Sequence, residues 1–163
     1  MDRPLAIVDI DGVVADVRHR LHHVESRPKD WDAFFAAAVE DPPHPEGVAV
    51  VQRLAADHEI VFLTGRPRWL RAATEAWLEA NGVGGHRLVM RPRNDRRPAA
   101  QVKLELVKEL AAGRQLDVIV DDDPAVVAAF RNAGLPVFAA DWERRTEAED
   151  VALHHAQDVA GET

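Results

Sequence analysis

The sequence contains no cysteine among its 163 residues. This absence excludes disulfides, thiolate metal sites and a cysteine nucleophile together. Long apolar runs are also missing: the first one ends at Asp9, short of the roughly 7–15 residues of a secretory signal and the roughly 20 of a membrane span. We therefore expect a cytoplasmic protein without a membrane segment.

Positive charge is the scarcer sign, because 20 Lys and Arg face 28 Asp and Glu, for a formal net charge of −8. A small protein that coats nucleic acid over its whole surface is usually basic, so that class is disfavoured. An anionic substrate then requires a metal or a local cluster of Lys and Arg. Otherwise the composition, 47% hydrophobic and 29% charged, is that of one soluble domain able to bury its own core.

Short apolar runs alternate along the chain with longer amphipathic segments. The runs are typical of strands covered on both faces, and they are Leu5–Val8, Ile60–Leu63, Arg87–Met90, Val118–Val120 and Pro136–Ala139. The amphipathic segments predict helices at Gly47–Asp57, Pro67–Asn81, Ala99–Ala112 and Pro124–Ala133. This alternation predicts an α/β domain with an open, doubly wound (Rossmann-like) parallel sheet of about five strands.

Two stretches depart from the alternation. Residues 14–45 separate the first strand from the next helix, and we interpret them as a short helical cap inserted over the carboxyl end of that strand, where open α/β sheets bind ligands. A purely structural excursion is the alternative. Residues 146–163 are rich in Ala, Glu and His without a strong apolar stripe, which indicates a peripheral helix or a tail.

The motif Asp9-Ile10-Asp11-Gly12 directly follows the first predicted strand. Both carboxylates then reach one edge of the sheet, where their like charges need a shared proton or a cation. Gly12 permits a tight turn immediately afterwards. An ordinary Asp-Gly turn gives the same short motif, so its meaning depends on the other strands.

Polar side chains also follow the other predicted strands. Thr64 follows the second strand, and Asp121 and Asp122 follow the fourth. Lys103 lies early in the helix after the third strand. These positions share one edge of a parallel sheet. Carboxylates, a hydroxyl and a lysine suit phosphoryl transfer, and Mg²⁺ favours carboxylate oxygens together with phosphate oxygens. The sequence therefore predicts a Mg²⁺-dependent phosphoryl-transfer site.

The four motifs in this order resemble the haloacid-dehalogenase (HAD) superfamily, from about Leu5 to Trp142. The resemblance implies a single HAD-like phosphatase domain over residues 1–145. It implies that Asp9 is the nucleophile of an aspartyl-phosphate intermediate and that Asp11 is the general acid and base. The presence of Asp11 favours phosphate-ester hydrolysis within the superfamily. The implied Mg²⁺ ligands are Asp9, Asp121, Asp122 and the backbone carbonyl of Asp11, and the implied phosphoryl-binding residues are Thr64 and Lys103.

A narrower resemblance lies in LTGRP, LVMRPRNDRRPAAQVK and VIVDDDP, which are similar to the 3′-phosphatase domain of bacteriophage polynucleotide kinases. It implies removal of a 3′-phosphate from a polynucleotide end or a nucleotide, as in nucleic acid repair. The implied substrate-binding residues are Gly65, Arg66, Arg91, Asp95 and Arg96, with His19 and Arg20 of the cap. The chain has no GxxxxGK[ST] loop, so a kinase or ligase partner would be a separate protein. Asp123 stands where the phage enzymes carry Arg, which removes one positive contact.

Several aromatic and histidine side chains allow more than one interpretation. Trp31, Phe34 and Phe35 have the spacing of one helix face, which suits packing of the cap or stacking on bases. Trp69 and Trp77 are expected to pack the helix after the second strand. His19, His22 and His23 have a spacing that can bind Zn²⁺, although no further ligand is evident.

Two other functions stay open. One is a 5′-nucleotidase or other small-metabolite phosphatase of the same superfamily. The other is a non-catalytic module that binds nucleic acid ends through the Arg-rich segment between Arg87 and Lys103, where six cations face one acid. A non-catalytic relative would be expected to carry a broken motif, and every motif here is intact.

Overall fold

Five parallel strands form one sheet in the computed structural model, which describes residues 2–25 and 27–160. The strands are β1 (Leu5–Val8), β2 (Glu59–Thr64), β3 (Arg87–Met90), β4 (Leu116–Asp121) and β5 (Val137–Ala139), in the order β3-β2-β1-β4-β5. The α/β fold with an open parallel sheet that the sequence predicts is thereby confirmed. The strand order reverses between β1 and β4, and sheets of this kind bind ligands outside the carboxyl ends of the strands at such a reversal.

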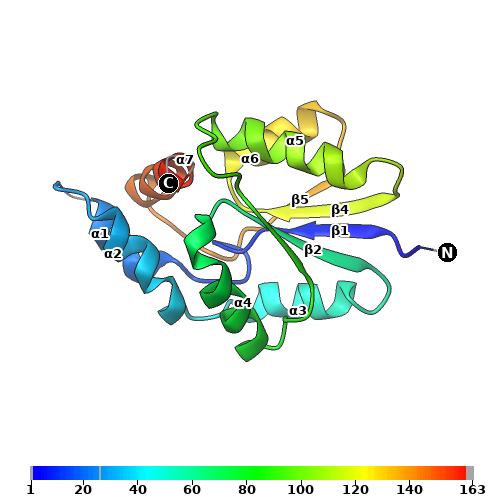
Figure 1. Ribbon diagram of the computed structural model, residues 1–163, viewed down its shortest axis with the longest axis horizontal. Coiled ribbons are helices and arrows are strands. Elements are labelled where there is room, and N and C mark those ends of the chain that lie inside the picture. The colour runs from blue at the N-terminus through cyan, green and yellow to red at the C-terminus, as the bar shows by residue number, and fades with distance from the viewer. Residues whose placement is uncertain (1, 26, 161–163) are drawn as a thin grey trace.

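Helices cover both faces of the sheet (Figure 1). One face packs against α3 (Pro45–Leu54) and α4 (Arg71–Ala80), and the other packs against α5 (Ala99–Ala111) and α6 (Pro124–Asn132). The apolar run of β1 serves both cores because successive strand residues point to opposite faces. Ala6 and Val8 join the first core, whereas Leu5 and Ile7 join the second.

The segment between β1 and α3 forms the cap that the sequence suggests. It contains the short helices η1 (Arg18–Arg20), α1 (His22–Glu25), α2 (Trp31–Ala36) and η2 (Ala37–Glu40). Asp30 begins α2, because its side chain accepts a hydrogen bond from Ala33 N at 3.0 Å. Figure 1 shows α1 and α2 beyond the carboxyl ends of the strands, beside the site described below.

The two tryptophans after β2 differ in their packing. Trp77 on α4 is buried, as the sequence predicts. Trp69 lies in the short helix η3 (Arg68–Leu70) and is 54% exposed, so the prediction that it packs the helix is wrong. The helix α4 begins only at Arg71, which leaves Trp69 in the preceding turn, where its side chain is not directed into the core.

The chain after β5 returns across the carboxyl edge of the sheet and forms α7 (Glu147–Ala160). Ala152, Leu153 and Ala156 are buried in the core on one side of this helix. In Figure 1, α7 lies at the same end of the sheet as α1 and α2, and α7 contacts α1. Within residues 2–25 and 27–160, no helix has the length and apolar character needed to cross a membrane.

Candidate active site

Three carboxylates converge where the strand order reverses. Asp9 follows β1, Asp121 ends β4 and Asp122 is the next residue. One oxygen from each lies within 4.8 Å of the others, and the three side chains are only 3%, 3% and 4% exposed. Burial, joined by the neighbouring acids, raises the pKa of Asp9 well above its usual range. Burial and the charge of Asp121 raise the pKa of Asp122 to about 7. Such a cluster stays ionised only beside a cation.

Lys103 on α5 supplies one positive charge to this cluster. Its Nζ lies 2.8 Å from Asp121 Oδ2 and 3.1 Å from Asp9 Oδ2. Burial disfavours the ammonium, but the two carboxylates outweigh burial and hold the pKa of Lys103 above its ordinary value. Thr64, at the end of β2, lines the same small cavity as Lys103, and its Oγ1 accepts a hydrogen bond from Arg66 N at 3.2 Å. The predicted hydroxyl, lysine and carboxylates thus meet at one edge.

The free oxygens of the cluster fit a divalent metal. Asp9 Oδ2 and Asp122 Oδ1 are buried without a hydrogen-bond donor, and the ammonium of Lys103 approaches Asp9 Oδ2 without the alignment of a hydrogen bond. The other oxygens have donors: Ile10 N lies 2.8 Å from Asp9 Oδ1, and Arg145 Nη2 lies 2.7 Å from Asp122 Oδ2. Carboxylate oxygens are ligands that Mg²⁺ prefers, and these two accept no hydrogen bond. The residues present therefore fit such an ion.

Gly12 is required by the close packing behind the cluster. Its φ is +80°, a conformation that side chains with a Cβ rarely adopt. A Cβ at this position would lie 2.0 Å from Asp122 Oδ2. The glycine of the DxDG motif therefore makes room for the carboxylate that follows β4.

The side chain of Asp11 points away from the cluster, toward the cap. Its Oδ1 accepts hydrogen bonds from Arg66 Nη2 at 2.7 Å, Arg66 Nε at 3.0 Å and Arg20 Nη2 at 3.1 Å. Burial opposes its ionisation, but Arg66 and Arg20 together outweigh burial and lower the pKa of Asp11. Asp11 is thus held as a carboxylate, 14% exposed, between β1 and the cap.

Asp41, which sequence reasoning missed, joins the cap to the site. Its buried carboxylate accepts hydrogen bonds from Arg20 Nε at 2.8 Å and from Arg66 Nη2 at 3.1 Å, and it lies 2.6 Å from His19 Nε2. Trp77 Nε1 donates to the backbone oxygen of Asp41 at 2.9 Å. Of the predicted cap residues, Arg20 contacts Asp11 directly as well as Asp41, whereas His19 contacts Asp41. A single acid before two prolines gave no signal of this role.

The predicted arginines of residues 91–97 separate into two kinds. Arg91 is buried and donates to the backbone oxygens of Asp95, Gln157 and Arg97, so in this structure it fixes the loop. Asp95 pairs with Arg97 at 2.6 Å, and these hydrogen bonds lower the pKa of Asp95 to about 2. Arg96 is exposed, and within the part of the chain that the structure describes it has no side-chain hydrogen bond.

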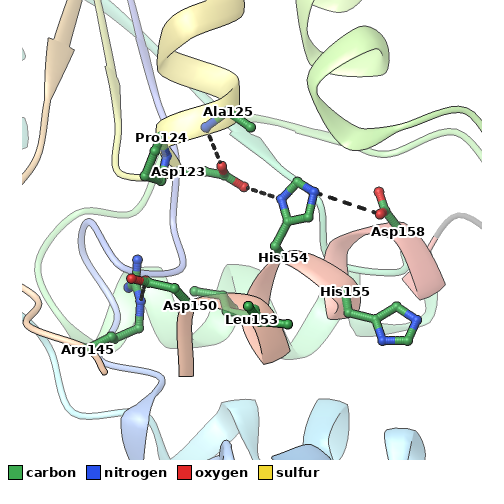
Figure 2. Close-up of a pocket in the computed structure, with 10 residues that line it drawn as sticks. Asp123, Pro124, Ala125, Arg145, Asp150, Leu153, His154, His155 and Asp158 are labelled. Carbon is green, nitrogen blue, oxygen red and sulfur yellow. Dashed lines mark hydrogen bonds and ion pairs between the residues drawn. The ribbon is translucent and has the colours of Figure 1, made fainter. Parts of the chain in front are cut away.

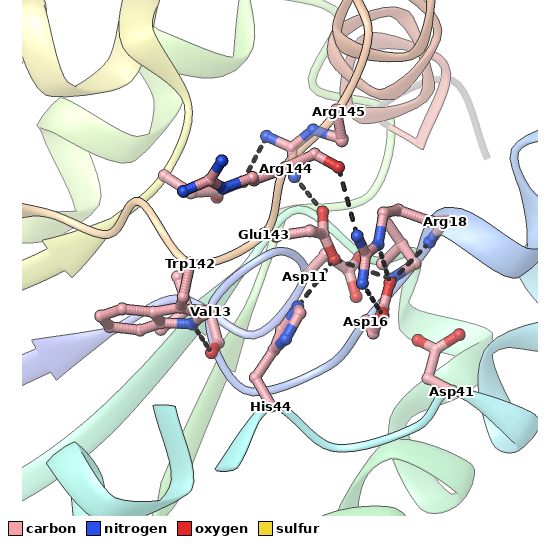
Figure 3. Close-up of polar contacts among 12 residues, drawn as sticks. Asp11, Val13, Asp16, Arg18, Asp41, His44, Trp142, Glu143, Arg144 and Arg145 are labelled. Atoms are coloured by element: carbon pink, nitrogen blue, oxygen red, sulfur yellow. Dashed lines mark hydrogen bonds and ion pairs between the residues drawn. The ribbon is translucent and has the colours of Figure 1, made fainter. Parts of the chain in front are cut away.

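The chain after β5 supplies a cation that sequence reasoning also missed. Arg145 Nη2 lies 2.7 Å from Asp122 Oδ2, and the same guanidinium pairs with Glu143 and with Asp150. Figure 3 shows Glu143 between Arg145 and His44, whose Nε2 lies 2.9 Å from Glu143 Oε1. Arg145 thus places a positive charge beside Asp121 and Asp122. The sequence resemblance predicts an arginine next to these acids, at the position that Asp123 occupies here.

Asp123 itself has a structural role. Its Oδ1 accepts a hydrogen bond from Ala125 N at 2.9 Å and begins α6, while its Oδ2 contacts His154 Nδ1 of α7 at 3.0 Å (Figure 2). The groove in Figure 2 lies between the start of α6 and α7, and the three clustered carboxylates do not line it. It is therefore an outer groove beside the site.

The helix α7 covers the carboxyl edge from the other side. Gln157 reaches Gly65 so closely that a Cβ there would lie 3.4 Å from Gln157 Cγ. Asp158 Oδ1 accepts a hydrogen bond from Ala99 N, at the start of α5, at 3.1 Å. The clustered carboxylates and Lys103 have little solvent access in this structure, and no motif in residues 146–163 indicated that α7 would cover them.

The fold and the acid, hydroxyl and lysine groups at its switch point define a HAD-type hydrolase domain. The chain also matches the sequence profile of the family described as "Polynucleotide kinase PNKP phosphatase domain" over residues 4–143. The protein therefore belongs to this family of HAD-type phosphatases, as the sequence resemblance implies.

Solved structures agree on the fold. A chain of the Pnkp1/Rnl/Hen1 RNA repair complex is 24% identical, with a TM-score of 0.69 over 88% of this chain and 44% of that one. A haloacid dehalogenase-like hydrolase from Streptococcus pneumoniae is 12% identical, with a TM-score of 0.62 over 91% and 90%. The HAD-hydrolase YfnB from Bacillus subtilis, solved with bound magnesium, is 8% identical, with a TM-score of 0.58 over 84% and 88%. This protein spans about half the length of the Pnkp1 complex chains it matches. Among curated proteins, none matches it significantly.

Proposed function

We propose that the protein hydrolyses phosphomonoesters with Mg²⁺ and that its substrate is the 3′-phosphate of a polynucleotide end. The observation that carries this proposal is the convergence of Asp9, Asp122 and Lys103, with one buried oxygen on each of the two acids that accepts no hydrogen bond. Membership in a family of polynucleotide kinase phosphatase domains supports the choice of substrate.

Asp9 acts as the nucleophile. Its carboxylate attacks phosphorus and forms an aspartyl phosphate while the bond from phosphorus to the sugar oxygen breaks. The leaving oxygen takes a proton from Asp11. Water then attacks the phosphorus of the intermediate, Asp11 takes a proton from that water, and inorganic phosphate and free Asp9 result. Lys103, 3.1 Å from Asp9 Oδ2, neutralises charge on the nucleophile and the transferred group.

Asp11 must carry a proton for the first of these steps, whereas Arg66 and Arg20 hold it as a carboxylate here. A phosphate dianion that reaches Arg66 competes for the same guanidinium. Binding of substrate therefore weakens the contacts that lower the pKa of Asp11 and favours its protonation. Asp11 therefore becomes available as an acid when a phosphate draws Arg66 away from it.

The metal would be held by Asp9, Asp121, Asp122 and the backbone carbonyl of Asp11. When bound, Mg²⁺ supplies positive charge that offsets the charge of the phosphate. Arg145 occupies one oxygen of Asp122 and leaves the other free, which orients this carboxylate toward the cluster.

The relevant partner, on this proposal, is a separate end-processing protein such as a kinase or a ligase. A chain similar to this one was solved in a complex named for RNA repair. This protein would then prepare the 3′ end while another protein modifies the 5′ end or joins the two.

A side-by-side assay in Mg²⁺ tests the proposal. The substrates are a 3′-phosphorylated oligonucleotide, a 3′-mononucleotide and a 5′-mononucleotide, with Asp9→Asn as the inactive control. We expect the highest kcat/KM on the oligonucleotide and none with Asp9→Asn. Preference for the 5′-mononucleotide would refute the 3′-end assignment while retaining the phosphatase.

A small phosphomonoester is the second candidate, because the reacting groups are nearly sealed by α7 and the cap. Asp11 is the most exposed of them, at 14%. If the mononucleotides and p-nitrophenyl phosphate are hydrolysed as well as the oligonucleotide, this second candidate is supported instead.

A further inference from the structure

Aromatic rings from three elements lie in contact beside the site. His155 of α7 lies 5.1 Å from Trp31 of α2, Trp31 lies 6.4 Å from Phe35, and Phe35 lies 6.4 Å from Trp69 of η3, between ring centroids. We call these four residues the aromatic strip. It follows the seam at which the cap meets the core and α7, the end of the molecule toward which the strands point in Figure 1.

Trp69 is exposed to an extent that packing does not explain. It is 54% exposed, although its edge-to-face contact with Phe35, at 89°, fixes the orientation of its ring. Leaving a large apolar ring in water forgoes the stabilisation that its burial would give. Arg66, three residues earlier in the same turn, donates to Asp11, so the turn that carries Trp69 begins at the edge of the site. An exposed, oriented ring at this position is suited to stacking.

Cations accompany the strip. The ammonium of Lys29 lies 5.5 Å over the ring of Trp31, and the same atom lies 3.1 Å from His155 Nδ1. Arg27, Lys29 and His155 line a concavity at one end of the strip, and exposed Arg68 adjoins Trp69 at the other.

Acids lie in the same region as well. Asp30 is engaged at the start of α2, Asp32 is an exposed acid on that helix, and Glu25 and Glu147 line a concavity with Lys29. Aromatic rings interleaved with cations are the composition of surfaces that bind single-stranded nucleic acid.

We propose that the accessible rings of the aromatic strip, those of Trp69, Trp31 and His155, bind single-stranded nucleic acid by stacking its bases, with Trp69 taking a base close to the 3′-phosphate. Phe35 is buried and only packs against the two tryptophans. The proposal rests on the function proposed above and deepens it, because it selects a single-stranded end with bases over a bare phosphate ester. Stacking does not read the sequence, so the strip serves ends of any sequence.

Kinetics of matched variants test the strip. The variants are Trp69→Ala, Trp69→Phe and Trp31→Ala, and the control is Phe138→Ala, because Phe138 is 52% exposed on β5 and stacks on Trp142 outside the strip. We expect Trp69→Ala to raise KM for a single-stranded 3′-phosphorylated oligonucleotide about 10-fold, the range given by one lost stack. Trp31→Ala should raise it less, and Trp69→Phe and Phe138→Ala should change it less than 2-fold. Activity on p-nitrophenyl phosphate, which carries no base, should stay unchanged in all four.

Fluorescence anisotropy of a 5′-labelled, unphosphorylated oligonucleotide gives a readout independent of hydrolysis. Trp69→Ala should weaken binding by the same factor as it raises KM, and a melting curve confirms that the variant is folded. Equal KM in Trp69→Ala and Phe138→Ala would overturn the proposal, as would equal losses on the oligonucleotide and on p-nitrophenyl phosphate. If the wild type binds the oligonucleotide through Trp69 but does not hydrolyse its 3′-phosphate, the strip stands and the proposed function fails.

Discussion

Substitution of Gly12 by alanine tests whether the carboxylate of Asp122 must pack against the turn after β1 for the reaction to proceed. The added Cβ would lie 2.0 Å from Asp122 Oδ2 and 2.5 Å from its Cγ. Contacts of Cβ atoms shorter than 3.0 Å are essentially never seen, so the carboxylate has to retreat by about 1 Å, a displacement that can cost about 100-fold in rate. We therefore expect kcat/KM to fall about 100-fold in Gly12→Ala.

A matched control separates this displacement from backbone strain. Gly85 has a φ of +81° and no heavy atom within 4 Å of a built Cβ. Both alanine variants should lose about 1–2 kcal/mol of unfolding free energy from the strained backbone. Gly12→Ala should lose about 3 kcal/mol more, at the low end for breaking a buried ion pair, because Arg145 keeps Glu143 and Asp150 as partners.

Urea unfolding, magnesium titration and steady-state kinetics on the same two variants give the answer. Gly85→Ala should retain wild-type kcat/KM within 2-fold and wild-type magnesium affinity. If Gly12→Ala keeps both as well, the close packing of Asp122 against the turn plays no part in the reaction, and the reasoning is refuted.

Three other expectations follow from the geometry of the site. Lys103→Met leaves the buried carboxylates of Asp9 and Asp121 without their cation. The variant should lose about 3–5 kcal/mol of unfolding free energy in metal-free buffer and regain part of that free energy with Mg²⁺. A melting temperature unaffected by the substitution would contradict this. Burial and Asp121 raise the pKa of Asp122 to about 7, so below that pH a metal ion must displace a proton from this carboxyl. Calorimetry should therefore show that Mg²⁺ affinity falls below about pH 7 and that binding releases a proton. A constant affinity between pH 8 and 6 would contradict this role of Asp122. Trp77→Phe removes the hydrogen bond from the indole to the backbone oxygen of Asp41 and should lower the unfolding free energy in urea by about 1 kcal/mol. Its kcat should change less than 2-fold. A stability equal to wild type would show that this hydrogen bond does not hold the cap in place.

The sequence predicted the fold because its signals are local. The apolar run of β1 lacks alternation since Ala6 and Val8 face one core while Leu5 and Ile7 face the other. Strand ends in a parallel sheet share an edge, so the positions of Asp9 and Asp121 after their runs were enough to place them together.

The contacts that sequence reasoning missed all join segments distant along the chain. Arg145 reaches Asp122 across 23 residues, and Arg66 reaches Asp41 across 25. No periodicity specifies the partner of a single charged residue. The face of α7 that is buried carries the small residues Ala152 and Ala156, which give a weak apolar stripe, so its place over the site had no signal either.

The outward position of Trp69 was missed for a related reason. A tryptophan within a helical pattern is normally a packing residue, and the short helix η3 that turns it outward precedes α4 without a break in that pattern. The exposure of this side chain depends on where η3 and α4 pack in the fold, which the local sequence does not specify.

Rapid acid quenching during turnover of a 3′-phosphorylated oligonucleotide tests whether Asp9 is the nucleophile. We expect mass spectrometry to find one phosphoryl group on the peptide that contains Asp9, sensitive to hydroxylamine as acyl phosphates are, and none in Asp9→Asn. Turnover at the wild-type rate without any phosphorylated Asp9, at quench times shorter than one catalytic cycle, would contradict it.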